Sequence, residues 1–212
     1  MQRKRVAVLI SGRGSNMAAL IEAAKDKNYP AEIALVASNR PDAGGLLVAQ
    51  AEGIASAVID HTIFGKDRAA FERALQRVLE EHRIELVCLA GFMRLLTADF
   101  VERWRGRMLN IHPALLPAFK GLDTHNRALA AGVKAHGATV HFVVPDMDSG
   151  PILAQAAVPV LTGDDEASLA ARVLAVEHRI YPAALKLLAE NRVRVENGAC
   201  FVDGAPVSLA AP

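Results

Sequence analysis

Residues 6–16 read VAVLISGRGSN, a short apolar run that leads directly into a loop with two glycines. Val6–Ile10 has the length and composition of a strand that is buried on both faces, and a helical pattern begins at Asn16. A strand, a glycine-containing turn and a helix are the first parts of a βαβ unit. The sequence therefore predicts an α/β fold that starts with this unit.

The alternation of strand and helix continues through the first half of the chain. Further apolar strands are expected at 32–37, 55–59, 85–90 and 108–111. Amphipathic helices are expected at 16–25, 45–52, 66–82 and 98–104. Such alternation is typical of parallel strands joined by right-handed crossovers. We expect a Rossmann-like open twisted sheet, mostly parallel, with helices on both of its faces.

The second half has a different pattern, which predicts an antiparallel part of the sheet. Two long β-rich runs flank a polar turn, and a long helix and a terminal hairpin follow. In chain order these elements are expected at 139–144, 152–160, 165–190, 192–196 and 199–202. Pro182 should kink the long helix. Because no Gly- or Ser-rich linker interrupts the chain, we expect one domain over residues 1–212.

Composition and charge narrow the class of protein. Apolar residues make up 52% of the chain and charged residues 22%, which is typical of a globular protein. The 24 Lys and Arg residues balance 23 Asp and Glu residues, so no nucleic-acid partner is expected and a small anionic metabolite fits at least as well. No apolar stretch approaches the roughly 20 residues that span a bilayer. Cys88 and Cys200 show no disulfide or metal-site spacing, so we expect a soluble, cytoplasmic protein.

The loop Ser11–Asn16 is a candidate phosphate site, because it joins a strand to the start of a helix. N–H groups at a helix N-terminus point outward, and the helix dipole adds positive potential there. The dinucleotide fingerprint G-x-G-x-x-G needs a third glycine where Met17 stands, and the Gly-Lys-Ser/Thr of a P-loop is absent. A phosphate ligand smaller than NAD or ATP is therefore favoured. The alternative is a structural turn in which Ser15 or Asn16 caps the helix.

A candidate catalytic pair lies at the end of the expected strand 108–111. Asn110 and His112 are two residues apart, so they face the same side of an extended chain, and Ile111 faces the other. A side-chain amide and an imidazole are a natural pair of donors to a developing oxyanion. In the polar turn, Asp148 could accept a hydrogen bond from a histidine, which would raise the pKa of that histidine. The alternative for Asp148 is a local turn bond before Gly150.

Two further charged residues have both a binding and a structural interpretation. Glu177 lies at the edge of the apolar stripe of the long helix and could hold a substrate amine or amide, or pair with Arg172 or Arg179 at the surface. Arg68 lies in the first turn of the helix 66–82 and could meet a ligand carboxylate, or only water.

Metal and covalent chemistry are not expected. His125, His136 and His141 lack the spacing of metal ligands. No G-x-S-x-G motif occurs, and Cys88 lies in the middle of a strand, so neither a serine nor a cysteine nucleophile is predicted.

Five segments together resemble the phosphoribosylglycinamide formyltransferase family, folate-dependent enzymes of purine synthesis. They are Ser11–Asn16, Leu89–Arg94, Asn110–Pro117, Gly121–His125 and Asp148–Pro151. The resemblance extends over nearly the whole chain. It implies formyl transfer from 10-formyltetrahydrofolate to the primary amine of glycinamide ribonucleotide, without a metal.

The resemblance also implies roles for individual residues. The catalytic residues would be Asn110, His112 and Asp148. The ribonucleotide would be held by Gly14, Ser15, Asn16, Leu174 and Glu177. The folate would be held by Arg68 at its glutamate tail and, around the pterin, by Met93, Arg94, Leu95, Leu96, Asn110, Val144, Asp146 and Asp148. The enzyme is expected to act as a monomer or homodimer on small molecules.

The chain departs from the family pattern at two positions and leaves other functions open. Ala114 stands where the family commonly has serine, and Pro145 stands where a polar residue is usual. Length argues against methionyl-tRNA formyltransferase and formyltetrahydrofolate deformylase, which carry extra domains. Formyltetrahydrofolate hydrolysis and a non-catalytic sensor of a phosphorylated metabolite remain the alternatives. The bond Leu116–Pro117 is a candidate cis peptide.

Overall fold

The computed structural model describes residues 2–207. The chain divides into two compact units, one ending at Leu109 and the other beginning at Asn110. The boundary falls inside strand β5 (Met108–His112), so each unit contains part of this strand. The predicted single domain stays a prediction.

Parallel strands form the centre of the first unit. They are β1 (Lys4–Ile10), β2 (Ala31–Ser38), β3 (Ser56–Val58) and β4 (Leu86–Leu89), in the spatial order β3-β2-β1-β4. Val8 of β1 lies opposite Val36 on one side and Cys88 on the other. Because β1 has a parallel neighbour on each side, residues Val6–Ile10 are fully buried, as their apolar run predicts.

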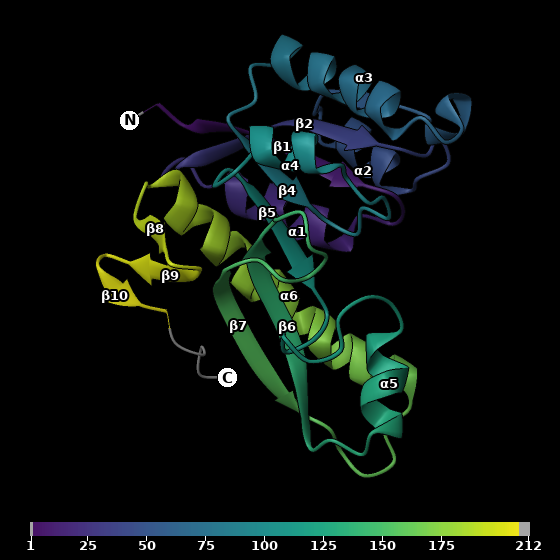
Figure 1. The fold of residues 1–212 in the computed structure, drawn as a ribbon, viewed down its shortest axis with the longest axis vertical. Coiled ribbons are helices and arrows are strands. Elements are labelled where there is room, and N and C mark those ends of the chain that lie inside the picture. The colour runs from purple at the N-terminus through teal and green to yellow at the C-terminus, as the bar shows by residue number, and fades with distance from the viewer. Residues whose placement is uncertain (1, 208–212) are drawn as a thin grey trace. The chain divides into compact units, whose positions relative to one another are not determined.

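The order of these strands decides where the helices lie. The chain moves outward from β1 through α1 (Ser15–Ala24), β2 and α2 (Gly45–Ala51) to β3, and then returns through α3 (Arg68–Glu81) to β4 on the other side of β1. Right-handed crossovers therefore put α1 and α2 on one face of the sheet and α3 on the opposite face (Figure 1). Ligands in open α/β sheets bind at such a reversal, next to the carboxyl ends of the two strands that flank it.

Two shorter elements complete the first unit. Helix α4 (Ala98–Arg103) begins where the sequence predicts it, with Thr97 as its N-cap. The 3₁₀ helix η1 (His61–Phe64) was not predicted. The Asp60 side chain accepts hydrogen bonds from the backbone and hydroxyl of Thr62, and this local turn bond starts η1.

The second unit contains the antiparallel part of the sheet. Strands β6 (Ala135–Phe142) and β7 (Ile152–Pro159) pair antiparallel, in the order β5-β6-β7. Helix α6 (Glu166–Ala189) packs on both strands (Figure 1). Asp165 and Ser168 form a capping box at its start. Pro182 lies inside this continuous helix, and the predicted kink stays a prediction.

The predicted boundaries of the elements in the second unit are less accurate than those in the first. Strand β6 begins four residues before the predicted start at Thr139. Helix α5 (Thr124–Ala130) was missed, since seven residues between two turns give too little periodicity to detect. The predicted hairpin is confirmed as β8 (Val193–Glu196) and β9 (Ala199–Val202), joined by Asn197 and Gly198 at positive φ, and β10 (Ala205–Pro206) extends it.

The predicted fold class is confirmed. The main sheet has seven strands and is mostly parallel, with β7 antiparallel to β6, and a small antiparallel sheet follows at the C-terminal end. Within residues 2–207, no helix has both the length and the apolar character needed to cross a membrane.

Candidate active site

The glycine loop of the first unit turns the chain sharply from β1 into α1. Gly14 is the N-cap of α1, with φ of +76°, so the cap by Ser15 or Asn16 that the structural alternative proposed is not formed. A Cβ atom on Gly14 would lie 3.1 Å from the Cα atom of Gly45. The loop therefore requires glycine twice over, for its left-handed conformation and for its close approach to α2.

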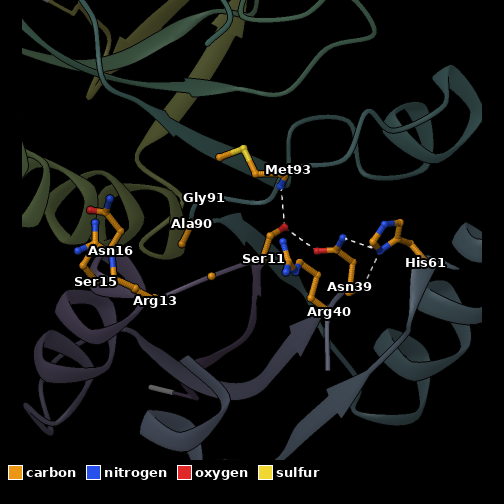
Figure 2. A pocket seen from close by; sticks show the side chains of 12 residues that line it. Ser11, Arg13, Ser15, Asn16, Asn39, Arg40, His61, Ala90, Gly91 and Met93 are labelled. Atoms are coloured by element: carbon orange, nitrogen blue, oxygen red, sulfur yellow. Dashed lines mark hydrogen bonds between the residues drawn. The ribbon is translucent and has the colours of Figure 1, made fainter. Parts of the chain in front are cut away.

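A pocket of about 380 Å³ opens beside this loop (Figure 2). It is lined by Ser11, Gly12, Arg13, Gly14, Ser15, Asn16, Asn39, Arg40, His61, Ala90, Gly91 and Met93. The three residues predicted to hold a phosphate therefore share one pocket with the start of α1. The backbone N–H groups of a helix start, together with Arg13, suit an anion.

The far side of this pocket contains polar residues that sequence reasoning missed. The Ser11 hydroxyl donates to Asn39 Oδ1 at 2.5 Å and accepts the backbone N–H of Met93 at 2.7 Å. The Asn39 amide nitrogen lies 3.1 Å from Nδ1 of His61 (Figure 2). Ser11 and Asn39 are buried. No motif in the sequence marks these three residues as a group.

The segment after β4, residues 91–97, belongs to no helix or strand and presents apolar side chains to solvent. Met93 is 64% exposed and Leu95 is 59% exposed, whereas Arg94 and Leu96 are half-buried. The Arg94 guanidinium lies 6.0 Å from the centre of the Phe71 ring. All four predicted folate residues of this segment are thus together, and the exposed pair offers an apolar surface to a flat ring. Arg68, at the start of α3, is exposed.

The second unit contains the three residues predicted to be catalytic, and His141 lies between two of them: its Nε2 atom is 3.1 Å from the Asn110 amide nitrogen and 3.8 Å from Oδ1 of Asp148. His112 lies near the end of β5 and is 5% exposed. Its Nδ1 atom is 3.5 Å from Oδ2 of Asp148, and its Nε2 atom is 3.0 Å from the carbonyl oxygen of Phe119. Both ring nitrogens therefore face acceptors, an arrangement that suits an imidazole carrying two N–H donors.

Asn110 has a partner that sequence reasoning did not find. Its amide nitrogen is 3.1 Å from Nε2 of His141, and Nδ1 of His141 is 2.9 Å from the carbonyl oxygen of Phe142. Burial lowers the pKa of His141, so this ring is neutral near pH 7. Nδ1 then carries the proton and Nε2 accepts from Asn110, which leaves the second N–H of the Asn110 amide for a ligand.

His141 lies where the pairing of β6 with β7 is irregular. The register of β6 against β7 shifts between Val140 and His141. The pairing passes from Val140 opposite Ala154 to His141 opposite Ile152, so the extra residue is Leu153 of β7, and nothing in the apolar run Thr139–Val144 marks this irregularity.

The loop that carries Asp148 is held closed at its base. The backbone N–H of Phe142 donates to the carbonyl of Pro151, and a Cβ atom on Gly150 would lie only 1.8 Å from the Phe142 oxygen. Asp148 has φ of +51°, and its Oδ2 atom accepts the N–H of Gly121 at 2.8 Å. Asp148 is thus fixed by backbone contacts. Of the other predicted folate residues in this loop, Val144 is half-buried and Asp146 is exposed.

Helix α6 carries the two residues predicted to bind the glycinamide end, Leu174 and Glu177, and neither is exposed. Glu177 is 6% exposed, so it does not lie at the surface, and Leu174 is half-buried. Arg172 bonds Asp164 at 2.7 Å. A buried carboxylate on this helix is a group that a substrate amine or hydroxyl could meet.

The structure also describes the proline bond, the alanine and the histidines that the sequence analysis singled out. The Leu116–Pro117 bond is cis. The buried carbonyl of Ala114 accepts the Thr139 hydroxyl at 2.6 Å. The rings of His125 and His136 lie 5.3 Å apart, and burial lowers the pKa of His136 to about 4. Across residues 2–207, no three His, Cys, Asp or Glu side chains are grouped to hold a metal ion.

This architecture, with a glycine loop at the sheet's reversal point and an Asn-x-His strand end, matches a known class. The formyl transferase family matches residues 4–185, and the chain belongs to this family. It is 43% identical over 199 residues to the phosphoribosylglycinamide formyltransferase of Escherichia coli K12, covering 94% of this chain and 93% of that protein. The solved phosphoribosylglycinamide formyltransferase of Coxiella burnetii superposes with a TM-score of 0.93 at 43% identity, covering 99% of each chain.

Other relatives differ in length. The chain is 51% identical over 203 residues to the human trifunctional purine biosynthetic protein adenosine-3, of which it spans 20%. A formyltetrahydrofolate deformylase of Pseudomonas syringae superposes with a TM-score of 0.87 at 27% identity, and the chain covers 66% of it.

Proposed function

We propose that this chain transfers the formyl group of 10-formyltetrahydrofolate to the primary amine of glycinamide ribonucleotide, in purine synthesis. The observation that carries the proposal is the grouping of Asn110, His112 and Asp148 at the end of β5 in a member of the formyl transferase family. We further propose that the enzyme acts in the cytoplasm as a monomer or homodimer, on small molecules alone.

The first unit supplies the phosphate site. Gly14, Ser15 and Asn16 would bind the ribonucleotide phosphate with the N–H groups of the α1 start, inside the pocket described above. The pocket suits one phosphate group better than a dinucleotide, because it lacks the third glycine of the dinucleotide fingerprint. In the second unit, Leu174 and Glu177 would meet the glycinamide end.

The folate would contact both apolar and hydrogen-bonding side chains. Met93, Arg94, Leu95 and Leu96 offer the apolar surface of segment 91–97, and Arg68 would pair with the glutamate tail. Val144, Asp146 and Asp148 offer hydrogen-bonding groups for the pterin.

The reaction needs no covalent enzyme intermediate. The amine nitrogen attacks the formyl carbon, a C–N bond forms, and the carbonyl electron pair moves to oxygen. The free N–H of Asn110 would donate to this oxyanion, and its donor is already oriented by His141. A proton then moves from the new ammonium to N10 of the folate, the C–N10 bond breaks, and formylglycinamide ribonucleotide and tetrahydrofolate leave.

His112 would be the second oxyanion donor and would carry the proton, or an ordered water would carry it. Asp148 faces Nδ1 and compensates the charge of a doubly protonated ring. Since Nε2 lies 3.0 Å from the Phe119 carbonyl, donation by Nε2 requires that this bond be exchanged for one to the substrate. Phe119 thus keeps His112 oriented before substrate binds.

A spectroscopic assay tests the function. Purified protein is mixed with a 10-formyl folate analogue, and release of the deformylated folate is followed by absorbance with and without glycinamide ribonucleotide. We expect release only when the nucleotide is present. Asn110→Ala and His112→Ala should remove this release while circular dichroism shows an unchanged fold.

The same assay separates the alternatives. Release without the nucleotide would show hydrolysis, the reaction of the deformylase relative, and would overturn the transferase proposal. Absence of release from folded protein in both conditions would favour a phosphometabolite sensor or a different acceptor.

A further inference from the structure

Three side chains from three different elements form one hydrogen-bonded chain in the first unit. Ser11 follows β1, Asn39 follows β2, and His61 begins η1. The Met93 N–H donates to the Ser11 hydroxyl, which donates to Asn39 Oδ1, and the Asn39 amide nitrogen contacts His61 (Figure 2). When each group donates to the next, the bonds polarise one another and strengthen.

His61 holds Asn39 in either tautomer. Its Nδ1 atom lies 3.1 Å from the Asn39 amide nitrogen and 2.8 Å from the Asn39 carbonyl oxygen. When Nδ1 is unprotonated it accepts from the amide, and when it is protonated it donates to the carbonyl. The backbone N–H of His61 also donates to the same carbonyl, at 3.2 Å.

Ser11 connects two segments to which the proposed function gives different substrates. It is the first residue of the loop that would hold the phosphate. Through the Met93 N–H, it also fixes the first residue of the segment that would hold the folate. A change in the position of Ser11 must therefore move the start of both segments.

The other end of the folate segment is fixed independently of this chain. Glu72 of α3 is buried, and its carboxylate accepts the backbone N–H of Thr97 at 2.6 Å and also bonds the Thr97 hydroxyl. The backbone from Met93 to Thr97 is therefore held at both ends, by Ser11 at Met93 and by Glu72 at Thr97.

We propose that Ser11, Asn39 and His61 are positioning residues that couple the binding of the two substrates, a role that rests on the proposed function. Ser11 holds Met93 in the position that receives the folate, and a phosphate bound in the loop stabilises Ser11 in that position. Positive coupling of this kind makes each ligand bind more tightly when the other is present.

Calorimetry on the full chain tests the proposal. The affinity for tetrahydrofolate is measured with and without saturating glycinamide ribonucleotide. In the unaltered protein we expect the nucleotide to tighten folate binding about fivefold or more. In Ser11→Ala the two affinities should become nearly equal. Ser56→Ala, an exposed serine of β3 in the same unit, is the matched control and should keep the full effect.

His61 provides a second, independent comparison. His61→Ala should lose most of the coupling, whereas His61→Asn, which restores a polar group near the position of Nδ1, should recover it. In kinetics, the His61→Ala defect should appear in KM for both substrates more than in kcat. Thermal unfolding of each variant shows whether it folds. If Ser11→Ala does not fold, the comparison of His61→Ala with His61→Asn still tests the proposal.

Two results would overturn the proposal: no coupling in the unaltered protein, or full coupling in both Ser11→Ala and His61→Ala. Neither is confused with failure of the proposed function, because that failure appears as absent formyl transfer by the unaltered protein in the absorbance assay.

Discussion

The Nε2 atom of His112 lies 3.0 Å from the carbonyl oxygen of Phe119, while Nδ1 of the same ring faces Asp148. His112 is therefore held between a neutral acceptor, which a substrate oxyanion can replace, and a charged one, which stays in place. This asymmetry assigns the two ring nitrogens different tasks in the proposed reaction, and it makes the role of Asp148 testable.

Asp148→Asn should lower turnover about 10²- to 10³-fold, the usual size of a lost electrostatic contribution at such a site. The amide keeps the shape of the side chain but not the charge that compensates a doubly protonated His112. The measurement is kcat against pH for both proteins. Near-normal turnover with an unchanged pH profile would exclude the ion-pair role.

His141→Ala should lower kcat about tenfold, with little change in KM. The variant leaves the Asn110 amide in place but removes the acceptor that orients it, so part of the oxyanion stabilisation is lost. Asn110→Ala should cost more, about 10²- to 10³-fold in kcat. Steady-state kinetics of the two variants and their combination give the answer. Fully additive losses would show that His141 does not act through Asn110.

Ser15→Ala combined with Asn16→Ala should weaken nucleotide binding with little change in kcat at saturation. These side chains line the pocket at the start of α1 and would contact the phosphate but not the reacting amine. Titration with glycinamide ribonucleotide measures the affinity. An unchanged dissociation constant would remove the phosphate site from this loop.

Gly14→Ala should destabilise the fold by about 1–2 kcal/mol, because alanine is strained at φ of +76°. Its Cβ would also crowd Gly45 of α2. Gly12→Ala is the matched control, since no atom lies within 4 Å of a Cβ at that position. Urea denaturation of the two variants makes the comparison, and equal free energies of unfolding would contradict the prediction.

His136 should make the protein less stable in acid. Burial lowers its pKa in the folded protein to about 4, from 6.5 in the unfolded chain. The unfolded state therefore binds more protons below pH 6.5, and stability is lost as the pH falls from 6.5 towards 4, by up to about 3 kcal/mol. Urea denaturation of the protein and of His136→Phe between pH 7.5 and 4.5 measures this. Parallel curves would assign the acid sensitivity to other groups.

The sequence was sufficient for the elements that are long or buried on both faces. The apolar run of β1 and the periodicity of α3 and α6 predict those elements, and alternation of strand and helix predicts the parallel sheet. Strand ends and short helices depend on local bonds instead. The side-chain cap from Asp60 that starts η1 is one such bond.

The candidate site likewise contains some residues that the sequence predicts and others that only the fold reveals. The spacing of Asn110 and His112 predicts a shared face, because a strand alternates with period two. His141 and Glu72 had no such signal. His141 is one more residue of an apolar run until the fold brings Asn110 beside it. Glu72 is one more charged residue on an amphipathic helix until the fold brings Thr97 against it. Contacts between residues far apart in the chain leave no spacing that a single sequence can reveal.

The hydrogen bonds that hold segment 91–97 fix its backbone without involving its exposed apolar side chains. Met93 is held by its backbone N–H, and Thr97 is held by its backbone N–H and hydroxyl. The exposed side chains of Met93 and Leu95 take no part in these bonds. An evolving or engineered enzyme could therefore exchange these two side chains and accept a differently substituted ring, while the backbone that presents them keeps its course.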